Sequence, residues 1–233
     1  TLTDELKGQI GYGKDTSNIS NSKVIFETAS MDYVQDGLVL MLDGIQNVRG
    51  WHSTSTNVWE DLSGNNNDLT LENVVSNSNN MYLDGIKSKV YSEKALDVVS
   101  VEMVLELEEK NDFVYIASFG NNSKSMAWSP VSDKGFSLGH QKKKYFVENL
   151  YKKSSISVQY NPDLMYLNSE KLTNNLAVES WGTPSTYPIA FGFYGNGAYR
   201  MKGKIYSIRI YNRALTKNEI NHNYEIDKKR FGI

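Results

Sequence analysis

GKIYSIRIYNRALTKNE, residues 203–219, is the stretch of the chain that decides the fold. Its first part, Ile205–Tyr211, alternates between two sets of side chains with a period of two residues, which is typical of a β-strand. Tyr206, Ile208 and Ile210 form the fully apolar set. The pattern therefore predicts a strand that points these three side chains into a core.

A helix is expected directly after this strand. Thr216 stands three residues before Glu219, the spacing of a capping box in which each side chain binds a backbone N–H of the first turn. Ile220, Tyr224 and Phe231 follow at helical intervals, as on the buried side of an amphipathic helix. The sequence thus predicts one short C-terminal helix.

Similar strand signals recur at short spacing from Gly37 onward, separated by Gly, Asn, Asp and Pro residues that favour turns. The predicted strands are Leu38–Leu42, Asp68–Leu71, Met81–Leu83, Lys89–Tyr91, Ser100–Glu108, Phe113–Phe119, Met126–Trp128, Phe136–Leu138, Lys144–Val147, Ser155–Tyr160, Leu164–Leu167, Ile189–Phe193 and Ile205–Tyr211. Many short strands with one helix indicate an all-β protein, built as a two-sheet antiparallel jelly-roll sandwich. Strands and helices do not alternate, which argues against a parallel sheet.

Composition and charge restrict the classes of function. The 233 residues carry a formal charge of -2, so a nucleic acid is not expected as the main partner. The chain has no Cys, which excludes a disulfide framework and thiol catalysis. It contains no run of about 18 apolar residues, so no membrane insertion is expected.

The first residues of the chain differ from the rest, because they are polar, contain glycine and are only weakly periodic. We interpret residues 1–35 as a linker or neck, or an N-terminal extension, that joins upstream sequence to the domain. Val24–Phe26 is a candidate edge strand within it. Residues 36–233 are predicted to form a single domain, because all-β domains of about this length are common.

Five segments, in this order, resemble the concanavalin A-like lectin/glucanase superfamily, in the laminin-G-like branch of phage minor structural proteins and Gram-positive surface proteins. They are GLVLMLD (37–43), WEDLSGNNNDLTL (59–71), MYLDG (81–85), VEMVLEL (101–107) and GKIYSIRIYNRALTKNEI (203–220). The resemblance implies a jelly roll of two curved antiparallel sheets over residues 37–233. It implies no single activity, because this fold hosts lectins, adhesins, glucanases and lyases.

Three carboxylates are candidates for catalysis if the protein is an enzyme. Retaining glucanases of this superfamily carry E-x-D-x-E on a strand, which places the acid and the nucleophile on one face, about 5.5 Å apart. Glu102, Glu106 and Glu108 share a strand and a face, but the Asp between the two Glu residues is absent. The alternative interpretation is an amphipathic strand with a solvated acidic face.

Asp61, Asn65 and Asp68 are candidate ligands for Ca²⁺. They belong to the DLSGNNND turn (61–68), whose alternating oxygen atoms suit a hard cation. Asn, Ser and Gly are also the residues that a tight turn uses to bind its own backbone. A structural turn is therefore the alternative to a metal site.

Exposed aromatic residues are candidates for binding a glycan, because sugar rings stack on flat aromatic faces while their hydroxyls meet polar groups. The candidates in polar loops or at loop edges are Trp51, His52, Trp128, Trp181 and Tyr194. Trp59 is instead expected in the core. For each candidate, packing inside the protein is the alternative.

These observations predict a non-catalytic binding module for a glycan or cell-wall polysaccharide, carried by a phage tail protein or a bacterial surface protein. The expected location is extracellular, on a virion or a cell surface, and other phage structural subunits are further candidate partners. Two alternatives stay open. One is a glycoside hydrolase or polysaccharide lyase that uses the three Glu residues, and the other is a purely structural tail module.

Overall fold

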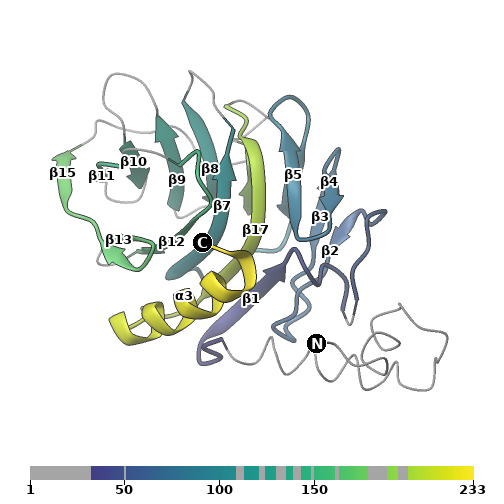
Figure 1. Ribbon diagram of the computed structural model, residues 1–233, viewed down its shortest axis with the longest axis horizontal. Helices are drawn as coiled ribbons and strands as arrows, with labels where there is room; N and C mark the ends of the chain where they lie inside the picture. The colour runs from purple at the N-terminus through teal and green to yellow at the C-terminus, as the bar shows by residue number, and fades with distance from the viewer. Residues whose placement is uncertain are drawn as a thin grey trace.

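The computed structural model describes residues 33–49, 51–108, 113–120, 124–129, 135–138, 143–147, 150–160, 163–177, 188–193 and 199–233. Within these ranges the chain forms two antiparallel sheets and one helix, α3 (Lys217–Phe231). The sheets lie face to face, and α3 lies across the outside of one of them (Figure 1). The predicted two-sheet sandwich with a short C-terminal helix is confirmed.

The sheet under α3, here called the helix-side sheet, has eight strands in the described ranges. Its order is β14-β13-β12-β7-β17-β5-β4, and β1 also pairs with β17. Their bounds are β1 (Leu38–Asp43), β4 (Val75–Asn77), β5 (Asn80–Asp84), β7 (Ser100–Leu107), β12 (Ser154–Gln159), β13 (Leu164–Leu167), β14 (Glu170–Lys171) and β17 (Lys202–Tyr211). Two of the longest strands, β7 and β17, lie side by side at its centre (Figure 1).

The opposite sheet has nine strands among the described residues, in the order β15-β11-β10-β9-β8-β16-β6-β3-β2. Their bounds are β2 (Val58–Trp59), β3 (Leu69–Glu72), β6 (Lys89–Ser92), β8 (Val114–Phe119), β9 (Lys124–Ser129), β10 (Gly135–Leu138), β11 (Lys143–Tyr145), β15 (Asn174–Ala177) and β16 (Ile189–Phe191). Every strand predicted from Gly37 onward overlaps an observed one. The candidate strand Val24–Phe26 lies outside the described residues.

The core lies between the two sheets and is built from alternate residues of both. Met103 of β7 and Ile208 of β17 meet Phe191 of the opposite sheet in one buried cluster. Trp59 is fully buried in this cluster, as predicted, and its indole N–H donates to the Asp43 carbonyl at 3.0 Å. A buried indole thus keeps a hydrogen-bond partner.

Strand β17 changes its inward face at Tyr206. Ile205 pairs with Leu105 of β7, whereas Ser207 pairs with the adjacent Val104. A step of two residues along β17 therefore corresponds to a step of only one residue along β7. Tyr206 is the extra residue of a β-bulge.

The bulge makes part of the predicted inward face wrong. Ile208 and Ile210 lie in the core as predicted, but Ile205 takes the third inward place. Tyr206 points to the outside of the sheet and packs against Phe231 of α3, with ring centroids 5.9 Å apart. The extra residue shifts the alternation by one position. The alternating pattern of the seven residues 205–211 does not by itself reveal this shift.

Helix α3 begins as predicted. Thr216 is its N-cap, the Glu219 N–H donates to the Thr216 hydroxyl, and Glu219 Oε2 accepts from the Thr216 N–H at 2.7 Å. Arg213 adds an ion pair to Glu219 at 2.6 Å. The helix ends at Gly232 in the left-handed conformation, with φ 67. No helix in the described part of the chain is long and apolar enough to cross a membrane.

Candidate functional site

Trp51 lies in the loop between β1 and β2, and 62% of its surface is exposed. Two backbone hydrogen bonds join it to Val48: the Trp51 N–H donates at 3.0 Å, and the Val48 N–H donates back at 3.3 Å. The indole therefore projects from a backbone that is fixed on its N-terminal side. Its exposure agrees with the prediction for this residue.

Asn47 fixes the loop on the other side of Trp51. Its fully buried amide donates to the Ser53 carbonyl at 2.5 Å and accepts from the Ser53 N–H at 2.7 Å. The same amide nitrogen donates to the hydroxyl of Ser76, on β4, at 2.6 Å. One side chain thus satisfies both polar groups of a loop residue and ties the loop to the edge of the helix-side sheet.

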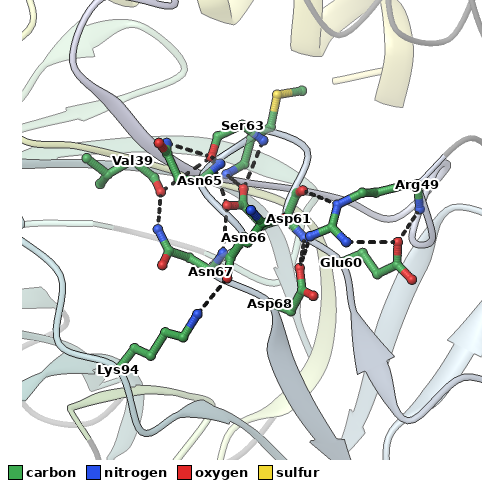
Figure 2. Close-up of polar contacts among 11 residues, drawn as sticks. Val39, Arg49, Glu60, Asp61, Ser63, Asn65, Asn66, Asn67, Asp68 and Lys94 are labelled. Atoms are coloured by element: carbon green, nitrogen blue, oxygen red, sulfur yellow. Dashed lines mark hydrogen bonds and ion pairs between the residues drawn. The ribbon is translucent and has the colours of Figure 1, made fainter.

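Arg49 ties the loop to the turn that follows β2 (Figure 2). Its backbone N–H donates to Glu60 Oε2 at 2.7 Å, and its Nε donates to the Asp61 carbonyl at 3.0 Å. Its Nη2 pairs with Asp68, and its Nη1 lies 3.6 Å from Glu60 Oε2. Each guanidinium nitrogen is therefore directed at an oxygen atom of the protein.

Asp61 organises the turn 61–68 from inside (Figure 2). Its carboxylate is fully buried. It accepts hydrogen bonds from the N–H groups of Met41, Ser63 and Asn67, each at 2.9 Å, and from the Ser63 hydroxyl at 2.8 Å. Both carboxylate oxygens are thus engaged by donors from β1 and from the turn itself.

These contacts do not fit a calcium site at the turn. Asp68 Oδ1 accepts from the Asp61 N–H at 2.8 Å and faces the Arg49 guanidinium, which supplies the positive charge that a cation would bring. Asn65 donates its amide to the Leu38 carbonyl at 3.0 Å. Among the described residues, no group of three or more His, Cys, Asp or Glu side chains is placed to hold a metal ion. The contacts are those of a structural turn.

Of the other aromatic candidates the structure describes Trp128 and His52, and neither is exposed as Trp51 is. Trp128 is 2% exposed in β9 and packs edge-on against Tyr151, with ring centroids 5.1 Å apart. Its assignment to a ligand-binding loop edge was wrong, because the alternation of β9 points it into the core. His52 is partly buried, and its ring nitrogens are shielded from solvent without a hydrogen-bond partner among the described residues. Trp181 and Tyr194 lie outside the described residues.

The three Glu residues in and directly after β7 do not form the expected solvated face. Glu102 is 2% exposed and accepts from Arg209 Nε at 3.1 Å. Glu106 is partly buried and accepts from the Tyr206 hydroxyl at 2.7 Å. Glu108 follows β7 and pairs with the first residue of β17 at 2.6 Å. The expectation was wrong at Glu102, because α3 covers this part of the sheet.

A buried polar network joins the helix-side sheet to α3, with Arg209 at its centre. Arg209 donates to both oxygens of Asp227, at 2.9 and 2.5 Å, as well as to Glu102. Asn223 donates to Glu102 Oε2 at 2.7 Å, and the Tyr33 hydroxyl donates to Asp227 Oδ1 at 2.8 Å. All five side chains are at most 2% exposed.

Burial controls the charge of this network. Loss of solvent raises the pKa of Glu102 to about 6, although Arg209 favours its ionised form. Desolvation also raises the pKa of Asp43, which pairs with Arg230 at 2.5 Å. Sequence reasoning missed the network. The available signal was the pair Asn223 and Asp227, four residues apart on the helix, where an apolar stripe would be expected.

No family model and no curated protein sequence matches the chain. Trypanosoma rangeli sialidase in complex with sialic acid matches with a TM-score of 0.62 and 15% identity, over 83% of this chain and 33% of that one. The binding domain of Paraclostridial Mosquitocidal Protein 1 matches with a TM-score of 0.56 and 15% identity, over 82% of this chain and 52% of that one. This chain therefore spans about half or less of those chains, and the similarity shows the β-sandwich fold alone.

Proposed function

We propose that this protein is a non-catalytic carbohydrate-binding module that holds a sugar ring against Trp51. The observation that carries the proposal is the combination of 62% exposure with a loop backbone fixed through Val48, Arg49 and Asn47. A flat apolar ring presented on a fixed loop binds a sugar face with little loss of conformational entropy. Exposed tryptophans are otherwise uncommon, because burial of the ring is favourable.

The charges beside the loop favour an uncharged sugar. Arg49 is occupied by Glu60, Asp61 and Asp68. Two carboxylates and the Asp61 backbone carbonyl thus surround the guanidinium, which leaves it without a free edge for the acid group of an anionic sugar. We therefore expect neutral hexose units of a cell-surface or cell-wall polysaccharide at Trp51.

The setting that we propose is extracellular, on a phage tail protein or a Gram-positive surface protein. Support comes from the five ordered segments that resemble the laminin-G-like branch of the concanavalin A-like superfamily. The sialidase bound to sialic acid and the toxin binding domain use a similar sandwich. The residues before Tyr33 would then serve as the neck, because Tyr33 itself is buried against α3, and neighbouring tail subunits would be further partners.

A catalytic function through Glu102, Glu106 and Glu108 has less support. A retaining glycosidase needs an acid and a nucleophile that both reach the substrate. Glu102 lies under α3 and is bound by Arg209 and Asn223, so a sugar cannot meet it while the helix is docked.

A glycan array of neutral and anionic surface polysaccharides tests the proposal. We expect binding to neutral glycans that falls at least about tenfold in Trp51→Ala, since central aromatic contacts dominate small interfaces. Ile86→Ala is the matched control, because Ile86 is 77% exposed on another loop and its loss should leave binding unchanged. Silence across the array would favour a purely structural module. Release of reducing sugar that disappears in Glu106→Gln would contradict a non-catalytic role.

A further inference from the structure

The buried carboxylate–guanidinium cluster between α3 and the helix-side sheet holds three carboxylates and two guanidiniums, counted over the described residues. Glu102, Asp43 and Asp227 are at most 2% exposed. They face two guanidiniums, Arg209 with 1% and Arg230 with 19% of its side chain exposed. If all five groups were ionised, the contact would carry one uncompensated negative charge in a desolvated place, which is costly.

Glu102 is the carboxylate with the weakest compensation. Asp227 receives both terminal nitrogens of Arg209, and Asp43 receives Arg230 together with two backbone N–H groups. Glu102 shares Arg209 with Asp227 and receives only its Nε. Among the described contacts, both hydrogen bonds to Glu102 end on Oε2, which leaves Oε1 as the place for a proton.

Every element packed around Glu102 contributes a group that faces it. Arg209 from β17 and Asn223 from α3 bind Glu102 directly, and Ser157 of β12 lies opposite it in the sheet. The neighbouring members of the cluster bind these two side chains or each other: Asp227 of α3, Tyr211 of β17 and Tyr33 of the segment before β1. Arg209 is the cation of this set, and its charge is shared. A buried carboxylic acid with a shared cation favours its neutral form more than it does in water.

We propose that the α3 contact is a proton-linked clamp, in which Glu102 takes up a proton in mildly acidic solution and α3 then binds the sheet more firmly. The pKa of Glu102 is about 6 in the folded protein and 4.5 in the exposed reference state. A raised pKa means that the folded state holds the proton more tightly than the unfolded or undocked state. The stabilising contribution is therefore complete below pH 4.5 and is lost as the pH rises through 6.

Thermal unfolding between pH 4.5 and 7.5 tests the clamp. Between these limits we expect the melting temperature of the wild type to fall by about 4 to 8 °C more than that of Glu102→Gln, which mimics the neutral acid. Glu106→Gln is the matched control, because it removes a carboxylate from the same strand face outside the cluster. Parallel profiles of the wild type and Glu102→Gln would overturn the proposal.

Two measurements on the wild type remain decisive if Glu102→Gln fails to fold. The carboxyl ¹³C resonance of Glu102 should titrate near pH 6, and a midpoint at or below 4.5 would overturn the clamp. After correction for intrinsic exchange, amide protection of α3 should rise from pH 7.5 to 5 relative to that of β8. An equal change in both elements would overturn the assignment to α3.

Discussion

The Tyr33 hydroxyl binds Asp227 Oδ1 at 2.8 Å, although 194 positions separate the two residues in the chain. The Arg209 guanidinium lies over the Tyr33 ring, 4.1 Å from its centroid, and binds the same Asp227. The segment before β1 and the helix α3 are therefore held by one shared cation and one shared carboxylate. Their attachment to the sandwich should be lost together.

Tyr33→Phe tests this link, because it removes the hydroxyl and keeps the ring over Arg209. We expect a loss of about 1 to 2 kcal/mol in the free energy of unfolding, measured with urea, since Asp227 loses a buried donor. Tyr82→Phe is the control, because the hydrogen bond of the Tyr82 hydroxyl to Glu108 is long, at 3.5 Å. Equal losses in the two variants would show that the Tyr33 hydroxyl has no special role.

Arg209→Leu should be far more damaging. It leaves Glu102 and Asp227 buried without a cation, for which we expect a loss of about 3 to 5 kcal/mol. Adding Glu102→Leu and Asp227→Leu should restore part of the stability, because no uncompensated charge then remains. Guanidinium titrations of the single and triple variants measure both steps. A triple variant no more stable than Arg209→Leu would contradict the charge argument.

Gly203→Ala tests the close contact of β17 with β7. The backbone of Gly203 has a φ of 149, and a Cβ there would lie 2.3 Å from the Glu106 carbonyl oxygen. We expect a loss of about 2 to 3 kcal/mol, because the two strands would have to separate. Gly64→Ala, with φ 87 and open space around the added carbon, should cost only about 1 kcal/mol. Chemical denaturation of both variants gives the comparison.

Glu219→Gln should reduce the sensitivity of the protein to strong acid. The hydrogen bond from Arg213, with further bonds from Thr216, lowers the pKa of Glu219 to about 2. A lowered pKa gives stability that is complete above pH 4.5 and is lost as the pH falls through 2, the opposite sign to Glu102. Melting curves at pH 7, 4.5, 3 and 2 should show a smaller loss in the variant. If the melting temperatures of the wild type and the variant fell equally with pH, the acid sensitivity would arise from groups other than Glu219.

Local sequence patterns were sufficient for the elements whose structure is set locally. The capping box at Thr216 and Glu219 was predicted, because two residues three positions apart define it. Trp59 was also predicted in the core, where it is fully buried. Alternation also predicted most strands. It did not predict which side of a strand faces the core where a bulge intervenes, as at Tyr206.

The candidate site was only partly predictable. The exposure of Trp51 was expected from its polar loop, but the fixing of that loop by Asn47 joins residues that are distant in sequence. Glu102 was expected on a solvated face, since alternation shows which residues share a face and not what covers it. Trp128 was wrongly expected at a loop edge because Pro130, two residues later, favours a turn. The alternation of its strand, β9, instead directs Trp128 into the core.

The bulge in β17 also determines which deletion the strand can accept. Without Tyr206, the residues from Ile205 to Ile210 would alternate without interruption, and Arg209 would still face α3. The lost contacts would include those of the aromatic side chain with Glu106, Phe231 and Lys153, and the hydrogen bond from the Gly44 N–H to the Tyr206 carbonyl. Removing Ile208 instead would turn Arg209 toward the apolar interior. The bulge, made by the two consecutive outward-facing residues Tyr206 and Ser207, is thus the place between Ile205 and Ile208 where the chain can lose one residue without changing the order of inside and outside.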